Sequence, residues 1–334
     1  MITAHEAKLL SNGLGKALQT ALSCSRFMRV QTQAPGRTTA AGCVRSMLST
    51  ATRYHRTAAR FLLNSLSQKP VDAAATRSSI AARAQMAAAS STWAGTGLSQ
   101  QDFMQRDECL VVDETDTLVG TSNKHDCHRF TPAQPRGLLH RAFSVFLFSP
   151  DGRLLLQQRA ASKVTFPSVW TNTCCSHPLA GQQPDEVDSP TQIADGSVPG
   201  VKAAAVRKLG HELGIPAEQL RAASFTFLTR LHYCAGDTHT YGPDAEWGEH
   251  EVDYILFVRP PQPVTLAPNP DEVDDVRYVD RAQLAAMMDP GSGLRWSPWF
   301  RILAERFLDA WWADLDETLA GTKHRDYGTI HHIL

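Results

Sequence analysis

The sequence of 334 residues has no long apolar run, no internal repeat and few cysteines. None of its apolar stretches approaches the ~20 residues that a helix needs to span a bilayer, so we expect no transmembrane segment. The seven cysteines show neither CxxC spacing nor the pattern of a small secreted protein. We therefore expect reduced thiols.

Acidic residues are almost absent from the first 95 positions. Glu6 and Asp72 stand against twelve lysines and arginines, and the segment is dense in alanine, serine and threonine. An Arg-rich, Ser-rich and acid-poor amino end is typical of an organelle transit peptide. A disordered basic tail is the alternative for residues 1–95.

The rest of the chain, residues 96–334, is acidic. It carries 21 basic and 32 acidic residues and hence a net charge of −11. Nucleic-acid binding relies on clustered lysine and arginine, so this balance argues against a nucleic-acid partner. An anionic small ligand would need its own local cations or a metal. We expect residues 96–334 to form one domain, which is long enough for a proper core.

The pattern of elements predicts the fold class. β-rich runs on both sides of Asp151-Gly152 predict a hairpin over residues 140–159. Residues 179–200 lack periodicity and are predicted to be a loop. Further strands are predicted around the turn at 113–117 and over 224–235, 249–260 and 276–280, and helices over 201–215, 280–288 and 298–319. The elements predict an α+β fold, a mixed sheet packed between helices.

The helix predicted at residues 201–215 carries a degraded Nudix signature. The stretch "RKLGHELGI" (207–215) follows Arg-Glu-apolar-x-Glu-Glu-x-Gly-apolar, but Lys208 and His211 replace two glutamates. Nudix hydrolases use such carboxylates to hold several Mg²⁺ ions that activate water. With Glu212 alone, one Mg²⁺ contact remains, enough to bind a diphosphate but poor for cleaving it. An ordinary amphipathic helix with a solvated glutamate is the alternative.

Two adjacent cysteines precede a histidine in "TNTCCSHP" (171–178). Neighbouring cysteines bridge each other only with severe strain, because a disulfide needs particular Cα separations. Metal binding, nucleophilic or acid–base chemistry and plain burial all remain open for this thiol pair.

Two carboxylates are predicted on one face of a strand in "WGEHEVDYIL". Glu249 and Glu251 are two residues apart and project to the same side. Burying both is costly unless a cation or partner compensates them. Three histidines near other strands or turns are candidate ligands: His128, His140 and His177. Such a set suits Mn²⁺, Mg²⁺ or Zn²⁺, although a single histidine is more often structural and spacing does not show that these residues converge.

Five blocks in order carry a resemblance to a known family. They are "LLHRAFSVFLF", "FPSVWTNTCCSHP", "RKLGHELG", "WGEHEVDYILF" and "SPWFR". From Glu108 to Leu319 the chain resembles type I isopentenyl-diphosphate Δ-isomerases, which have a Nudix-like fold. The first 95 residues lie outside the resemblance.

The resemblance implies a role for each matching residue. The catalytic positions are Cys175, Glu251 and, near the glutamate, Tyr233. The substrate contacts are Lys124, Arg159 and Lys163 at the diphosphate and Trp299 as an aromatic wall. The ligands of a divalent metal (Mn²⁺, Mg²⁺ or Zn²⁺) are His128, His140, His177, Glu249 and Glu251, and Glu212 helps hold Mg²⁺ on the substrate diphosphate.

The resemblance also implies an activity: conversion of isopentenyl diphosphate to dimethylallyl diphosphate. A Nudix-type hydrolase is disfavoured by Lys208 and His211. A metal or redox module without activity and a catalytically dead paralogue remain as weaker alternatives. We expect a monomer with a small diphosphate substrate and neither nucleic acid nor membrane as partner. A plastid location fits an isoprenoid enzyme with such an extension, while a mitochondrial location or a shorter cytosolic form from Met86 or Met104 stays open.

Overall fold

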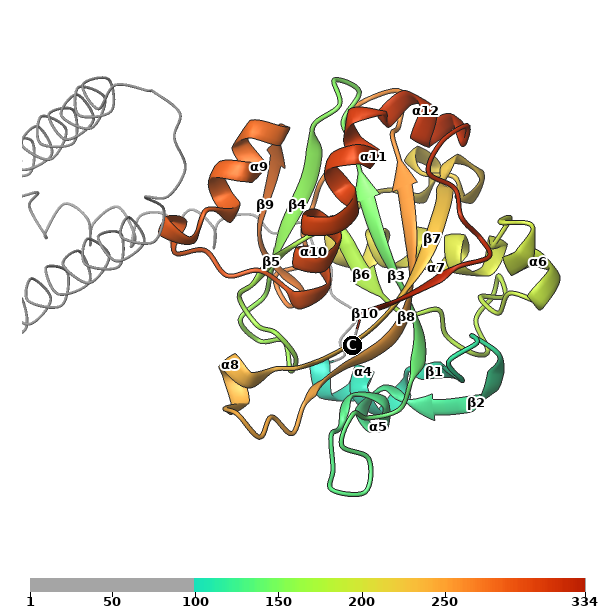
Figure 1. Cartoon of the computed structure of the whole chain (residues 1–334), viewed down its shortest axis with the longest axis vertical. Coiled ribbons are helices and arrows are strands. Elements are labelled where there is room, and N and C mark those ends of the chain that lie inside the picture. The colour runs from blue at the N-terminus through green and yellow to red at the C-terminus, as the bar shows by residue number, and fades with distance from the viewer. Residues whose placement is uncertain (1–98, 334) are drawn as a thin grey trace, which may run out of the picture. The chain divides into compact units, whose positions relative to one another are not determined.

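A seven-stranded mixed sheet is the centre of the computed structural model, which describes residues 99–333 (Figure 1). Its strand order is β10-β7-β8-β3-β1-β2, and β6 pairs with β3. The strands are β1 (Glu108–Val112), β2 (Leu118–Asn123), β3 (His140–Leu147), β6 (Cys174–Ser176), β7 (Thr226–Gly236), β8 (Gly248–Val258) and β10 (Ile330–Ile333). Strand β3 runs parallel to β8 with His140 opposite Glu251, so the register alone places two predicted ligands side by side. The predicted transit peptide lies outside the described residues.

A second, three-stranded sheet corrects the predicted hairpin. It has the order β5-β4-β9, with β5 (Trp170–Thr171), β4 (Leu154–Arg159) and β9 (Val273–Val279). The turn at Asp151-Gly152 is present, but β3 and β4 share only the bridge between Phe148 and Leu154 before they separate into different sheets. Both edges of β3 are occupied, by β8 on one side and by β1 and β6 on the other. No edge of β3 is therefore left for β4.

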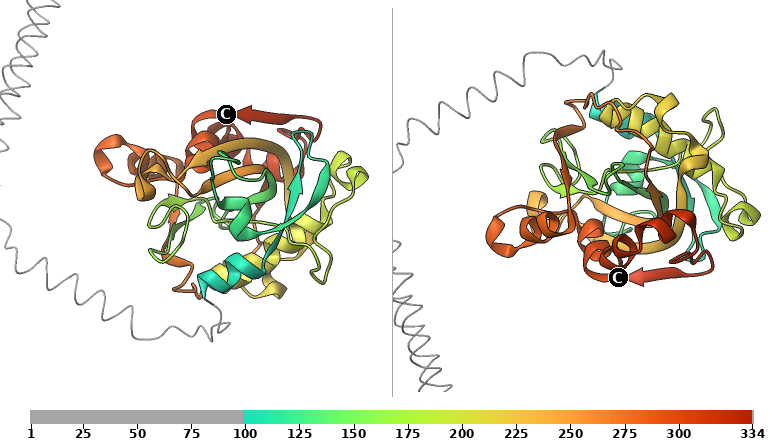
Figure 2. Two further views of the ribbon diagram at one scale, coloured as in Figure 1. Left: turned by 90° about the horizontal axis from the view of Figure 1, so that it is seen from below. Right: turned by 90° about the horizontal axis from the view of Figure 1, so that it is seen from above.

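Helices cover both faces of the central sheet (Figure 2). Helix α7 (Pro199–Leu213) buries Val201, Ala205 and Leu209 against one face. On the other face, Phe146 and Phe257 of the sheet pack with aromatic residues of α10 (Pro298–Leu303) and α11 (Asp309–Ala313). This arrangement is the predicted α+β fold, a mixed sheet packed between helices.

The prediction of one continuous helix over residues 298–319 is wrong, because the structure divides this range into several segments. A π-helical turn, η4 (Ala304–Leu308), follows α10, and Asp314 separates α11 from α12 (Leu315–Ala320) with φ −101° and ψ 36°. The π-helical turn shifts the phase of the helix, so that Leu303 before it and Leu308 and Trp311 at its end and beyond all remain buried. An uninterrupted helix would carry part of this apolar surface away from the sheet.

The segment predicted as a loop, residues 179–200, contains a short helix. Helix α6 (Pro190–Ala194) begins with a capping box, because Ser189 and Gln192 each accept a hydrogen bond from the other residue's backbone. The sequence Ser-Pro-Thr-Gln carried this signal. Helix α7 ends at Gly214, as predicted, with φ +63°.

The remaining elements are short. They are α4 (Gln100–Arg106), α5 (Lys124–His128), α8 (Thr238–Tyr241), α9 (Arg281–Met288), η1 (Ala217–Gln219), η2 (Ala222–Ser224) and η3 (Pro290–Ser292). The predicted helix near 280–288 and the strands near 224–235, 249–260 and 276–280 are confirmed. All five cysteines of residues 99–333 are free thiols. Within the same range, no helix combines the length and apolarity required to cross a membrane.

Candidate active site

The structure gathers the predicted site residues around one small cavity of about 30 Å³. Eleven of the twelve line it directly: Lys124, His128, Arg159, Lys163, Cys175, His177, Glu212, Tyr233, Glu249, Glu251 and Trp299. The twelfth, His140, stacks against the rings of His128 and His177 with centroids 4.7 and 4.8 Å away. Residues from eight separate segments of the chain therefore share one site, which spacing alone did not establish.

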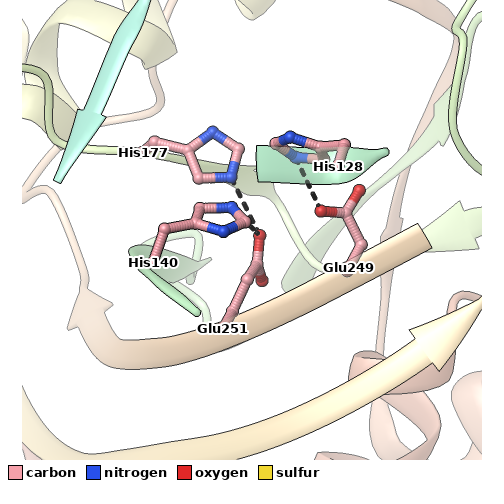
Figure 3. Close-up of side chains that lie close together, drawn as sticks. All are labelled: His128, His140, His177, Glu249 and Glu251. Atoms are coloured by element: carbon pink, nitrogen blue, oxygen red, sulfur yellow. Dashed lines mark hydrogen bonds and ion pairs between the residues drawn. The ribbon is translucent and has the colours of Figure 1, made fainter. Parts of the chain in front are cut away.

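Three imidazoles and two carboxylates point toward one another (Figure 3). Their ligand atoms all lie within 4.8 Å of one another, and all five residues are buried. Strand β8 supplies both carboxylates on one face, β3 supplies His140 and α5 supplies His128. Strand alternation and the β3–β8 register thus build most of this cluster.

The tautomers of two histidines favour a cation. The Nδ1 atoms of His128 and His140 lie 2.6 and 2.8 Å from the backbone carbonyls of Lys124 and Leu138, to which they donate hydrogen bonds. In the neutral ring, each Nε2 therefore carries a lone pair, and neither Nε2 has a hydrogen-bond partner among residues 99–333. The Nε2 atom of His128 lies only 2.8 Å from an oxygen of Glu249, which is also without a hydrogen bond in that part of the chain. Two lone pairs so close together fit the ligand shell of a divalent metal.

The two carboxylates of the cluster differ in proton affinity. Burial would raise the pKa of Glu249, but the imidazoles of His128 and His140 and the guanidinium of Arg159 lower it overall. Burial, together with the neighbouring carboxylates of Glu249 and Asp253, raises the pKa of Glu251 well above its usual range. Of the two, Glu251 is therefore the carboxylate with the higher proton affinity.

Glu251 is oriented from both sides. The Tyr233 hydroxyl donates to its Oε2 at 2.5 Å, and Nε2 of His177 lies 2.9 Å from its Oε1. Tyr233 is opposite Glu251 in the β7–β8 pairing. The side chain is thus fixed in one position at the cavity wall.

The thiol of Cys175 is held by an asparagine and an indole. It donates to Oδ1 of Asn172 at 3.0 Å and accepts a hydrogen bond from Nε1 of Trp299 at 2.9 Å. The amide of Asn172 donates to two backbone carbonyls, which fixes its carbonyl toward the sulfur. Burial raises the pKa of Cys175 to about 12, so the sulfur carries a proton. Cys174 alternates to the opposite face of β6 and is fully buried in the core.

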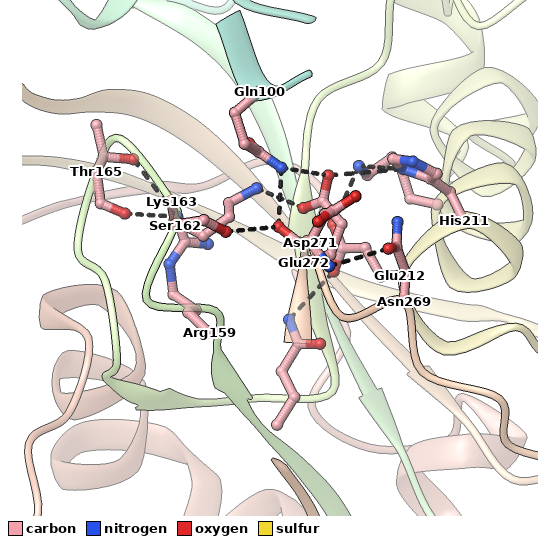
Figure 4. A network of polar contacts seen from close by, with 12 residues as sticks. Gln100, Arg159, Ser162, Lys163, Thr165, His211, Glu212, Asn269, Asp271 and Glu272 are labelled. Carbon is pink, nitrogen blue, oxygen red and sulfur yellow. Dashed lines mark hydrogen bonds and ion pairs between the residues drawn. The ribbon is translucent and has the colours of Figure 1, made fainter. Parts of the chain in front are cut away.

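Charged residues form a network of polar contacts beside the cavity (Figure 4). Nζ of Lys163 lies 2.5 Å from Oε2 of Glu272, and Nζ of Lys208 lies 3.2 Å from Oε1 of Glu212. All four side chains are at most 8% exposed. Burial lowers the pKa of Lys163 to about 8. Two buried ammonium groups and two buried carboxylates therefore balance one another here.

Four residues around the cavity were not found from the sequence. Thr165 and Ser176 line it, Asn172 orients the thiol and Glu272 holds Lys163. Asn172 lies inside the "TNTCCSHP" block, so its position carried a signal. Glu272 is 109 residues from its lysine, and nothing in the local pattern connects them.

The chain is similar to known proteins over most of its length. Residues 138–300 match the family model of the NUDIX domain. Isopentenyl-diphosphate Delta-isomerase II of Clarkia xantiana is 45% identical over 246 residues, which cover 72% of this chain and 78% of that protein. Isopentenyl-diphosphate Delta-isomerase I of Camptotheca acuminata is also 45% identical, over 73% of this chain and 98% of that protein. The chloroplastic isomerase I of Arabidopsis thaliana is 43% identical over 79% of this chain and 87% of its own length. The chain belongs to the isopentenyl-diphosphate Delta-isomerase family.

Proposed function

We propose that this cavity is the site at which the enzyme isomerises isopentenyl diphosphate to dimethylallyl diphosphate, with Cys175 and Glu251 as the acid–base pair. The observation that carries the proposal is that both groups line one cavity between the His/Glu cluster and the basic residues. The reaction adds a proton to the terminal CH₂ carbon of the alkene and removes one from the CH₂ carbon next to the diphosphate-bearing end. One group delivers the first proton and the other accepts the second, so no proton is gained or lost overall.

The surroundings of the pair suit a carbocation-like transition state. An alkene is a very weak base, so protonation needs a positioned acid and an environment without water. The indole of Trp299 forms one wall and is 2% exposed. The Cζ atom of Arg159 lies 5.6 Å from the centroid of this ring. A ring face that already accepts a cation can stabilise a developing positive charge by about 2 kcal/mol when desolvated.

The His/Glu cluster fits a divalent metal, for which Mn²⁺, Mg²⁺ and Zn²⁺ all suit the ligand set. Held by His128, His140, His177, Glu249 and Glu251, such an ion would supply positive charge that tunes the proton affinity of Glu251. Glu212 would hold a Mg²⁺ ion that accompanies the diphosphate, and Lys124, Arg159 and Lys163 would bind the phosphate oxygens.

Lys208 supports isomerisation over hydrolysis. Its ammonium pairs with Glu212, four residues further along α7. A Nudix hydrolase would have a glutamate at this position, with which to hold a further Mg²⁺. Here the position carries a positive charge, which cannot hold a further Mg²⁺ ion and so activates no water.

Substrate binding requires the cavity to widen. Its volume of about 30 Å³ holds only a few water molecules. Arg159 and Lys163 line the cavity, and movement of their side chains onto phosphate oxygens would enlarge it. The substrate is then a small diphosphate that displaces the present ion pairs.

We place the enzyme in the plastid, as a monomer. Three of the relatives, two from Arabidopsis thaliana and one from Cannabis sativa, are named chloroplastic. The acid-poor residues 1–95 fit a transit peptide ahead of a catalytic domain at residues 96–334.

Paired substitutions in β8 test the assignment. Glu251→Gln keeps a ligand oxygen but cannot transfer a proton, so it should retain bound metal and lose about 100- to 10,000-fold in kcat. Glu249→Gln should lose metal affinity first and recover rate when metal is added in excess. Bound metal and turnover are measured on the same samples. Near-normal turnover in Glu251→Gln would show that this residue is only a ligand.

A further inference from the structure

A second cavity, of about 470 Å³, lies between the β1–β2 turn, α6 and the segment before β10. None of the described residues that line it also lines the catalytic cavity. Arg141 at its floor follows His140 of the metal cluster, and neighbouring residues of a strand point to opposite faces. The two cavities are therefore built on opposite faces of β3. Nothing in the isomerase reaction requires this second cavity.

Two buried arginines form the floor. Arg141 and Arg230 are 1% and 7% exposed, and both bind the carboxylate of Asp116, at 2.8 and 2.9 Å. Tyr254 also donates to this carboxylate. Two guanidinium groups thus share the oxygens of one carboxylate. Asp188, at the rim, adds a negative charge near Arg141, but its carboxylate accepts hydrogen bonds from the amides of Gly200 and Val201.

The polar groups at the floor have spare donors and occupied acceptors. Nε of Arg230 is buried and has no hydrogen-bond partner among residues 99–333. Nη1 of Arg141 reaches only the backbone oxygen of Asp188, at 3.5 Å. Unsatisfied buried donors are costly, so a ligand that brings acceptor oxygens would be favoured here.

The backbone at the floor is irregular, as is common near binding sites. Asp116 has φ +65°, a left-handed conformation that costs a residue other than glycine free energy. The β7–β8 register shifts between Phe227 and Arg230, which is a bulge directly before the arginine. Both irregularities position the same ion-paired group.

The walls of the cavity are apolar. Leu118 (42% exposed), Pro190, Ile193 and Tyr327 surround the arginines, and the volume is in the range of small-molecule sites. We propose that this cavity binds an amphipathic monoanion, a carboxylate with an apolar chain, whose head pairs with Arg230 and Arg141 and whose chain packs on Leu118 and Ile193. A carboxylate head supplies acceptor oxygens to the spare donors of both arginines, while the apolar walls need a chain of several carbons.

Calorimetric titration of the full chain with octanoate tests this proposal. We expect saturable binding at one site, weaker for hexanoate by about fourfold per lost methylene and much weaker for octan-1-ol, which has no charge. Mg²⁺ with inorganic diphosphate should not compete, and Lys163→Gln should bind octanoate normally. These two controls separate the second cavity from the catalytic one, so the result does not depend on the proposed function.

Arg230→Gln should weaken octanoate binding about tenfold or more, whereas Arg153→Gln, which removes an exposed arginine paired with Asp151, should not. Leu118→Ser, at a partly exposed position, should reduce the preference for octanoate over hexanoate and decides the question if Arg230→Gln does not fold. Absence of saturable binding, equal binding of octan-1-ol, or unchanged chain-length preference in Leu118→Ser would overturn the proposal.

Discussion

At the scale of single residues, the catalytic cavity depends on partners that fix each reactive atom. Asn172 holds the thiol of Cys175, Tyr233 holds Glu251, and Glu272 holds Lys163. The first contact lies within the "TNTCCSHP" block, and the second joins two residues that were predicted from the sequence. The third crosses from the β4–β5 connection to the start of β9, and only the folded chain reveals it.

Lys163 gives the site a dependence on alkaline pH. Its pKa is lowered to about 8 by burial, and Glu272 opposes this shift. As pH rises through this value, the ammonium loses its proton, so KM should rise while kcat changes less. In Glu272→Gln, only the like charges of Lys124, Arg159 and Lys208 would remain nearby, and the rise in KM should begin at a lower pH.

The matched control is Asp271→Asn, an exposed neighbour whose carboxylate makes no contact with Lys163 among the described side chains. KM is measured between neutral and alkaline pH for the unaltered enzyme, Glu272→Gln and Asp271→Asn. Coincident profiles of KM against pH would refute the role of Glu272. The free energy of unfolding should respond to alkaline pH in a different way from substrate binding. The unfolded lysine has a pKa near 10.4 and binds more protons above about pH 8, so the free energy of unfolding should increase with pH across that window.

At the scale of elements, the sequence predicts strands better than their pairing. Strand alternation located β7, β8 and β9, and a glycine followed by a proline located the end of α7. The predicted hairpin at 140–159 failed because pairing depends on which edges of β3 other strands occupy. The prediction of one continuous helix after Pro298 was wrong for a similar reason, because the burial of Trp311 and Leu315 depends on the sheet against which they pack.

The end of α7 illustrates how an element positions the site. Gly214 has φ +63°, and a Cβ there would lie 2.3 Å from the backbone oxygen of Ala267. Gly214→Ala should therefore lower the free energy of unfolding by about 1–3 kcal/mol. Gly120→Ala, where nothing lies within 4 Å of the new Cβ, should change it by less than about 0.5 kcal/mol. Urea unfolding of both variants measures the difference, and equal stabilities would contradict this account of the cap.

At the scale of the whole molecule, the charge distribution separates two parts of the chain. Residues 1–95 are basic and residues 96–334 are acidic, so the near-zero net charge of the whole chain conceals two segments of opposite charge. The seven-stranded sheet and every residue of the two cavities lie in the second part.

Residues 1–95 fused to a fluorescent protein should direct it to plastids, as an acid-poor Arg- and Ser-rich segment would. The matched control is the same fusion with its arginines replaced by glutamine. Cytosolic fluorescence from the unaltered fusion would show that the segment is not a transit peptide.

The central claim is proton exchange at the alkene by Cys175 and Glu251, and the most direct test is the reaction in D₂O. Carboxyl and thiol protons exchange with solvent, so the group that delivers the proton would carry deuterium. We predict dimethylallyl diphosphate with deuterium in a methyl group, nearly complete loss of this product in Cys175→Ala, and little loss in Cys174→Ala. Release of phosphate without alkene migration, product without deuterium, or equal losses in the two cysteine variants would contradict the account.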